Sequence, residues 1–138
     1  MKDFLEVFNS LSSDNLHRLS EIYTDDIHFV DPAHEIQGLD NLRSYFEKLY
    51  ANVSSVDFDF HEALRVGQSG YVQWIMNFSH PRLSGGHAIE VPGSSFLQFS
   101  DDDKVLHHRD YFDLGSMLYQ HLPVIGGVVR AINRRLGT

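Results

Sequence analysis

The stretch IHFVDP at residues 27–32 alternates apolar and polar side chains and ends in an acid followed by proline. Because successive side chains of a β-strand point to opposite faces, Asp31 is expected on the same face as Ile27 and Phe29. A carboxylate that points at an apolar surface loses hydration, so it needs hydrogen-bond partners, a path to solvent or a chemical task. Asp31 is therefore either a cap at the turn before Pro32 or a functional acid.

Helical periodicity surrounds this strand. Apolar residues recur at intervals of three and four within residues 2–11 and 13–24, with a polar break at residues 12–15, and again within residues 39–52. This spacing is typical of amphipathic helices. The sequence predicts two short helices before the strand and a third, longer helix after a turn-rich loop at residues 31–38.

From Val56 onward the apolar period changes to two, which is typical of strands. Turn-forming residues at 67–70, 84–86 and 101–103 separate the expected strands. The strands are expected around residues 56–61, 72–78, 96–99 and 104–112. An antiparallel meander with one apolar face must cover that face, so it should curl over the third helix. The predicted fold class is α+β: three N-terminal helices packed on a curved, mostly antiparallel sheet, plus an extra C-terminal amphipathic helix. The interior of this cone is the place for a functional site.

Composition supports one globular unit. The chain has 138 residues, of which 42% are hydrophobic, with ten Phe, six Tyr and one Trp. This length suits a single domain spanning residues 1–138, with a core at about 1–115 and a helical extension at about 114–138. The supply of aromatic rings favours a packed interior that contains a pocket for an apolar ligand.

Charge and cysteine content exclude several classes of function. The formal net charge of −8 argues against a nucleic-acid binder, which needs basic residues to neutralise phosphates. The chain has no cysteine, which excludes disulfides, thiolate nucleophiles and Cys-ligated zinc and is compatible with a cytoplasmic location. Nine histidines are present, but His107 and His108 point to opposite faces of a strand, and no His-x-His or His-Glu-x-x-His pattern occurs. We predict no metal and no cofactor.

The tail is cationic and amphipathic. Five aliphatic residues share one face of the expected helix, whereas Arg130, Asn133 and Arg134 lie largely on another, with Arg135 flanking. The aliphatic residues are Ile125, Val128, Val129, Ile132 and Leu136. The helix either closes the mouth of the cone, packs in a dimer interface or rests on an anionic membrane surface; packing is favoured over membrane contact.

The order of elements resembles that of the NTF2-like superfamily, within it the SnoaL-like and ketosteroid-isomerase-like branch. The resemblance covers about residues 5–115. It rests on Tyr23-Thr24-Asp25-Asp26, Phe29-Val30-Asp31-Pro32, Gly38 with Leu42-Arg43-Ser44-Tyr45-Phe46, and Lys104-Val105 through Arg109-Asp110-Tyr111-Phe112-Asp113. It implies a cone open at one end, and the superfamily includes isomerases, dehydratases, cyclases and non-catalytic binding domains.

The resemblance also implies roles for individual residues. In the isomerase branch the carboxylate of the corresponding Asp-Pro pair is the general base, and Asp31 matches it. The tyrosine donor of the first helix falls near Val7 or Phe8, that of the third helix falls at Phe46, and the protonated acid falls at Ser95. Since losing one oxyanion donor costs on the order of 3 kcal/mol, these replacements predict a poor steroid-type isomerase. Phe46 and Ser95 are instead expected to contact a substrate.

The last strand is expected to supply the remaining polar groups. Because side chains of a strand alternate between its two faces, His108, Asp110 and Phe112 point to one face and the residues between them point to the other. The resemblance places this set inside the cone. Our hypothesis is that Asp31 removes a proton, while His108 or Asp110 returns one or holds an oxyanion. The alternative is structural: Asp110 pairs with His108 or Arg109, and a buried histidine is simply hydrogen-bonded. Trp74, Met76 and Phe78 on a neighbouring strand are expected as ligand wall or as ordinary core.

These features predict a small enzyme that binds a hydrophobic, carbonyl-bearing molecule and transfers protons: an isomerase, dehydratase or cyclase. The alternative is a non-catalytic binding domain for an apolar ligand or a partner, membrane-peripheral through its tail. The superfamily often pairs through the outer face of its sheet. Exposed Tyr71, Ile75 and Tyr111 would suit that pairing, so a homodimer is expected.

Overall fold

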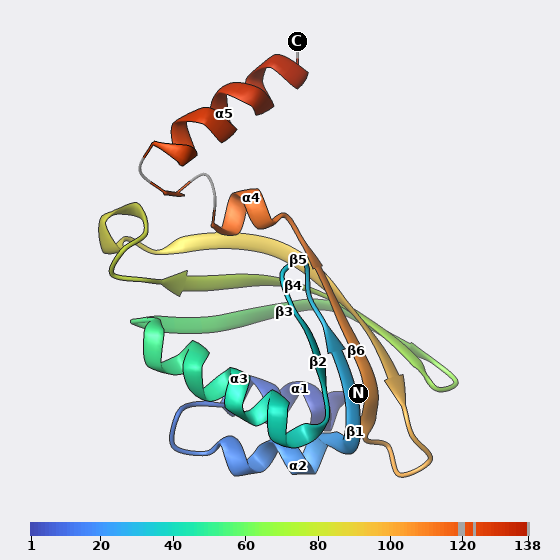
Figure 1. Cartoon of the computed structure of the whole chain (residues 1–138). Helices are drawn as coiled ribbons and strands as arrows, with labels where there is room; N and C mark the ends of the chain where they lie inside the picture. Colours follow the sequence, from blue (N-terminus) through green and yellow to red (C-terminus); the bar gives the residue numbers. More distant parts are fainter. Residues whose placement is uncertain (119–120, 123, 138) are drawn as a thin grey trace.

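The sheet that the period-two segments build has six strands and remains open. The computed structural model describes residues 1–118, 121–122 and 124–137. The strands, in the spatial order β2-β1-β6-β5-β4-β3, curve around the N-terminal helices (Figure 1). They are β1 (Tyr23–Val30), β2 (Glu35–Gln37), β3 (Ser55–Val66), β4 (Ser69–Ser79), β5 (Ile89–Phe99) and β6 (Val105–Phe112). The helices are α1 (Lys2–Ser10), α2 (Leu19–Ile22), α3 (Leu39–Asn52), α4 (Leu114–Met117) and α5 (Ile125–Leu136).

The predicted meander is confirmed. Strands β3, β4, β5 and β6 pair antiparallel in chain order. Strand β1 then pairs parallel with β6, and the short β2 pairs antiparallel with β1 and forms the sheet edge. The fold is the α+β cone that the sequence predicts, and its sheet is mostly antiparallel, as expected.

Two sequence-based boundaries are wrong. The helix expected at residues 13–24 is a single 3-10 turn at Leu16–Arg18 followed by α2, because the chain turns into strand at Tyr23. Tyr23 pairs with Val105 of β6, so tertiary pairing overrides the helical spacing of its apolar residues. The loop expected at residues 31–38 contains β2, whose residues pair with the end of β1.

The core lies between the helices and the concave face of the sheet. Its most deeply buried side chains come from β1, α3, β5 and β6, at 0% exposure for Ile27, Leu42, Leu97 and Val105. These residues belong to the period-two and three-to-four patterns seen in the sequence. The same face that buries Ile27 and Phe29 continues towards Asp31 at the open end of the cone.

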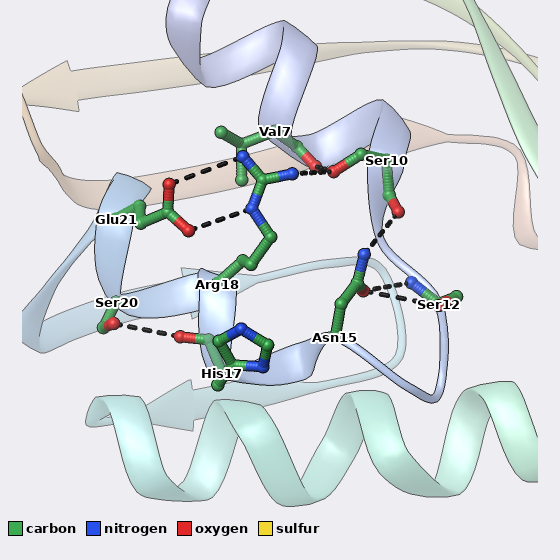
Figure 2. Close-up of polar contacts among 8 residues, drawn as sticks. All are labelled: Val7, Ser10, Ser12, Asn15, His17, Arg18, Ser20 and Glu21. Atoms are coloured by element: carbon green, nitrogen blue, oxygen red, sulfur yellow. Dashed lines mark hydrogen bonds and ion pairs between the residues drawn. The ribbon is translucent and has the colours of Figure 1, made fainter.

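Polar side chains hold the turn between α1 and the 3-10 segment, as Figure 2 shows. Asn15 accepts a hydrogen bond from the Ser12 backbone N–H at 2.7 Å and donates to the Ser10 carbonyl at 2.8 Å. Arg18 donates to the Ser10 hydroxyl oxygen at 2.8 Å and pairs with Glu21 at 2.9 Å. The predicted break at residues 12–15 is therefore a structured turn that sets α1 against the rest of the core.

After β6 the chain forms α4 and then α5 at the open end of the cone. Asp113 caps α4 by accepting a hydrogen bond from the Gly115 N–H at 2.8 Å. His121 ties this segment to the loop before β5, with Nδ1 2.6 Å from the Ser84 hydroxyl and Nε2 2.7 Å from the Ser116 carbonyl. Helix α5, confirmed at its predicted position, projects beyond α4 away from the sheet (Figure 1). None of the helices in the described part of the chain combines the length and apolarity needed to cross a bilayer.

Replacing Gly93 with alanine should lower the free energy of unfolding by about 1–3 kcal/mol, because overpacking forces neighbours out of their preferred positions. A Cβ at Gly93 would collide with the indole ring of Trp74. Urea denaturation followed by tryptophan fluorescence measures the change. Gly127→Ala is the matched control: its Cβ would meet nothing within 4 Å, and its effect should stay within about 1 kcal/mol. Equal losses in both variants would contradict close packing at Gly93.

Candidate functional site

A cavity of about 250 Å³ lies between α3, the concave face of the sheet and α4. Its wall is mainly aromatic and aliphatic, and its polar side chains come from the ends of strands and from α3. The aromatic lining consists of Phe8, Phe29, Tyr45, Phe46, Tyr50, Phe58, Trp74, Phe78 and Phe112. Two wider depressions on the outer face of the sheet, of about 840 and 730 Å³, are more open to solvent and collect few ionisable groups. The enclosed cavity is the better candidate site.

Asp31 is at the mouth of this cavity and also closes the turn after β1. Its Oδ1 accepts hydrogen bonds from the backbone N–H groups of Ala33 and His34, at 2.8 and 2.7 Å. Its Oδ2 accepts one from the Tyr45 hydroxyl at 3.0 Å, and His34 Nδ1 is 3.2 Å from Oδ1. The side chain is 8% exposed. Both sequence-based interpretations therefore describe the same side chain: Asp31 caps the turn and faces the cavity.

Asp110 is the second acid of the cavity and is held by a buried polar network. Its Oδ1 accepts hydrogen bonds from His108 Nε2 at 2.6 Å and from the Ser95 hydroxyl at 2.5 Å. Trp74 Nε1 donates to Ser95 at 2.9 Å, and the Tyr23 hydroxyl is 2.7 Å from His108 Nδ1. Within the described residues no hydrogen bond reaches Oδ2 of Asp110. One oxygen of this carboxylate is thus fixed, and the other remains able to bind a ligand.

The parallel pairing of β1 with β6 explains why the two acids share a cavity. Phe29 pairs with His108, and Val30 pairs with Arg109. Since side chains alternate, the residues that follow, Asp31 and Asp110, continue on the same face as Phe29 and His108. The carboxylates therefore project into the same end of the cone from neighbouring strands.

Three tyrosine hydroxyls lie in or behind this cavity, and all have raised pKa values. Burial, followed by the charge and the hydrogen bond of Asp31, raises the pKa of Tyr45. Burial raises the pKa of Tyr50 to about 12. Burial and then the charge of Asp110 raise the pKa of Tyr23 well above its usual value. These hydroxyls stay protonated near neutral pH, so each is a hydrogen-bond donor.

The structure brings most of the residues singled out from the sequence to the cavity wall. The lining includes Asp31, Asp110, Phe46, Trp74, Met76, Phe78 and Phe112. His108 and Ser95 do not line it: they lie behind Asp110, at 2% and 5% exposure, beside a void of about 10 Å³. They therefore reach a ligand only through Asp110.

Sequence reasoning did not assign a role to Tyr45 or Tyr50. Both belong to the apolar stripe of α3, and both line the cavity, on either side of Phe46 in the chain. Their position in the stripe was the available signal, since a tyrosine on a core-facing stripe needs a partner for its hydroxyl. Tyr45 finds that partner in Asp31. For Tyr50 no hydrogen bond is found within the described part of the chain, so its hydroxyl can serve a ligand.

The acids and histidines do not gather as metal ligands. Among the described residues, no group of three or more His, Cys, Asp or Glu side chains is arranged to hold a metal ion. No Lys or Arg is among the described residues that line the cavity. Its polar chemistry comes from two carboxylates, hydroxyls and imidazoles, which are the groups of general acid–base catalysis.

Comparison with known proteins identifies the family and the fold. The model of the SnoaL-like domain family matches residues 1–108. The chain belongs to this family. No curated protein sequence matches it. The family model ends within β6, so α4 and α5 lie beyond the matched residues.

Solved structures show the same NTF2-like fold at low sequence identity. A hypothetical protein with a ketosteroid isomerase-like fold from Catenulispora acidiphila, in complex with trimethylamine, is 19% identical with a TM-score of 0.74, over 87% of this chain and 90% of its own. An NTF2-like protein from Burkholderia pseudomallei is 13% identical with a TM-score of 0.72, over 85% and 90%. A protein from Shewanella denitrificans, provisionally assigned as a SnoaL-like polyketide cyclase, is 17% identical with a TM-score of 0.68, over 83% and 88%.

The raised pKa values of the buried tyrosines predict that the free energy of unfolding falls in alkali. The unfolded chain releases tyrosine protons near pH 10, whereas folded Tyr50 keeps its proton up to about pH 12. A group with a raised pKa in the folded state stabilises the fold fully below its unfolded pKa, and this contribution is lost as the pH rises. Urea denaturation at a series of pH values should therefore show the free energy of unfolding falling between about pH 10 and 12.

The variants Tyr50→Phe and Tyr71→Phe separate this effect from general alkaline damage. Tyr50→Phe should remove part of the decline, because no proton is then retained at this position. Tyr71 is 53% exposed, so Tyr71→Phe should leave the decline unchanged. Identical pH profiles for wild type and Tyr50→Phe would show that Tyr50 is not buried as described.

Proposed function

We propose that this protein is a cofactor-independent enzyme that transfers protons on a small, apolar, carbonyl-bearing molecule, by isomerisation, dehydration or ring closure. One observation carries the proposal: two carboxylates from neighbouring strands, Asp31 and Asp110, face one apolar cavity beside tyrosine hydroxyls. Carboxylates in such surroundings can divide the roles of general base and general acid. The provisional polyketide cyclase assignment of the Shewanella denitrificans protein supports ring closure as one of these reactions.

In this proposal Asp31 removes a proton from carbon. Its Oδ1 is held by two backbone N–H groups, so the carboxylate is already oriented before a substrate binds. Asp110, carrying a proton on its second oxygen, donates that proton to the substrate, while His108 and Ser95 position its first oxygen. The proton taken up by Asp31 then passes to Asp110 through solvent, which restores both acids for the next turnover. His108 thus acts as a positioning residue, since it does not line the cavity.

Tyr50 supplies the hydrogen bond to the substrate oxygen. The positions that the family resemblance assigns to oxyanion donors hold Val7, Phe8, Phe46 and Ser95, and only Ser95 can donate. Tyr50 follows Phe46 by one turn of α3, and the two rings stack at 6.1 Å. A neutral phenol in an apolar cavity stabilises a developing oxyanion by a preorganised hydrogen bond.

The size of the cavity limits the substrate. About 250 Å³ lies below the roughly 300–1,000 Å³ of pockets that take drug-sized ligands. The wall is mainly apolar, and its described residues include no Lys or Arg to bind an anionic group. We therefore expect a compact, uncharged molecule with one carbonyl group.

The catalytic role of Asp31 can be tested with small cyclic ketones. In deuterated water, wild-type protein should exchange the protons next to the carbonyl faster than Asp31→Asn by about 10²–10⁴-fold, the range of general base catalysis. Nuclear magnetic resonance follows the exchange. Tyr50→Phe should lower the rate by about 10²-fold or more, because an oxyanion donor is lost.

Asp57→Asn is the matched control. Asp57 is exposed on β3, so this substitution removes the same charge at a position outside the cavity. It should retain the wild-type rate. Circular dichroism of each variant checks that the fold is kept. If Asp31→Asn exchanges protons as fast as wild type does, Asp31 is not the base.

The second candidate function is non-catalytic binding of an apolar molecule in the same cavity. The observation that favours it is that both acids already have internal partners: Asp31 has Tyr45 and its own turn, and Asp110 has His108 and Ser95. Acids satisfied in this way can be purely structural. In that case the ketones of the exchange assay would bind, as seen by chemical-shift changes, without any exchange above background.

We also propose that the protein forms a homodimer through the outer face of its sheet. Tyr71 and Tyr111 are 53% and 52% exposed on this face, and Leu64 beside them is 64% exposed. These residues line a depression of about 840 Å³ on this face. Contiguous apolar area of this kind commonly marks an interface.

Light scattering at micromolar concentration should give twice the mass of the chain. Tyr71→Lys places a charge in the proposed interface and should shift the protein towards monomer, whereas Asp14→Lys, at an exposed position in the turn after α1, should not. A monomeric wild-type protein would contradict the dimer.

A further inference from the structure

Helix α5 presents an aliphatic stripe to solvent. Ile125, Val128 and Ile132 are 53%, 55% and 52% exposed, and Leu136 is 81% exposed. At about 100° per residue these side chains fall on one side of the helix. No residue of α5 lines the described part of the cavity wall, so the helix does not close the cone. Burial in the chain's own core therefore does not account for this stripe.

The charge of this region is opposite to that of the rest of the chain. All 19 acidic residues lie at or before Asp113, and three of the 11 basic residues, Arg130, Arg134 and Arg135, lie in α5. On the helix, Arg130 and Arg134 fall opposite the aliphatic stripe, and Arg135 falls at its edge. A cationic face combined with an aliphatic face is the pattern of helices that lie in a membrane interface.

We propose that α5 docks the protein onto the surface of an anionic lipid bilayer. The stripe enters the boundary between headgroups and acyl chains, and the arginines contact lipid phosphates and anionic headgroups. Twelve residues rise about 18 Å, well short of the roughly 30 Å of a hydrocarbon core, so the helix lies along the surface.

Three observations favour a bilayer over a protein groove as the occupant. The stripe is wholly aliphatic, whereas protein interfaces concentrate their binding energy in aromatic and arginine anchors that fill shaped pockets. The charge asymmetry turns α5 towards anionic lipid and the acidic body away from it, which suits attachment by one end. Helix α5 also projects from the open end of the cone, where a flat surface can reach it (Figure 1).

Docking through α5 would also bring the cavity near the lipid. Met117 and Leu118, at the end of α4, line the cavity and lie just before the segment that leads to α5. An apolar molecule dissolved in the bilayer would then meet the cavity mouth at the membrane surface. This consequence is independent of whether the cavity is catalytic.

Vesicle flotation of the full-length protein tests the proposal. The protein should float with phosphatidylcholine vesicles that contain about 30% phosphatidylglycerol. With vesicles of phosphatidylcholine alone it should remain at the bottom of the gradient. Raising the salt from about 0.1 M to 1 M should release it, because the Debye length falls from about 10 to 3 Å. Arg134→Gln should lower the partition coefficient about fivefold, the effect expected for one cation at the surface.

Paired double variants test the stripe. Val128→Ser with Ile132→Ser removes aliphatic area from the stripe and should abolish flotation. Ala131→Ser with Asn133→Ser places two serines outside the stripe, so this double variant should still float with the vesicles. Circular dichroism and thermal unfolding of both proteins show whether the fold is intact.

Several results would overturn the proposal. These are equal flotation with neutral and anionic vesicles, no flotation of the wild type, or equal loss in both double variants. The proposal also fails if α5 mediates self-association instead. Light scattering without lipid would then show an oligomer that Val128→Ser with Ile132→Ser dissociates, while wild-type protein does not float.

Discussion

The parallel pairing of β1 with β6 is the constraint on which the site depends. The two strands are far apart in the chain, and their register places Phe29 beside His108 and Val30 beside Arg109. This register turns Asp31 and Asp110 to the same face. A slip of one residue would send one acid to the outer face of the sheet and leave the cavity with a single carboxylate.

The polar network behind Asp110 shows how the fold tolerates buried polar groups. His108 has a partner at each ring nitrogen, and Ser95 both accepts from Trp74 and donates to Asp110. Each hydrogen bond offsets the loss of hydration, and a network in which every side chain has a partner favours one geometry. The aromatic rings around His108, among them Phe29 at 4.8 Å, exclude water and keep that geometry. The same packing that stabilises the core thus fixes the direction of the Asp110 carboxylate.

Three features of the chain meet at the open end of the cone. The cavity, α4 and α5 all lie there, and the helices fall beyond the residues that the family model matches. The common fold supplies a curved sheet and a long helix around a hollow, while the chemistry depends on the side chains that line it. Tyr50 illustrates this point, because it sits one turn of α3 from Phe46, where the resemblance places a donor that this chain lacks.

The sequence by itself determined the elements whose pattern is local. Alternation in residues 27–31 predicted that Asp31 faces inward, the stripe within residues 39–52 predicted α3, and period two after Val56 predicted the meander. Only the tertiary structure decided that β1 begins at Tyr23 and pairs parallel with β6, that His108 and Ser95 stand behind Asp110, and that Tyr45 and Tyr50 line the cavity. The Tyr23 and His108 side chains that meet there are separated by 85 positions in the chain. No local period encodes such a contact, because its free energy comes from the packing of the whole core around it.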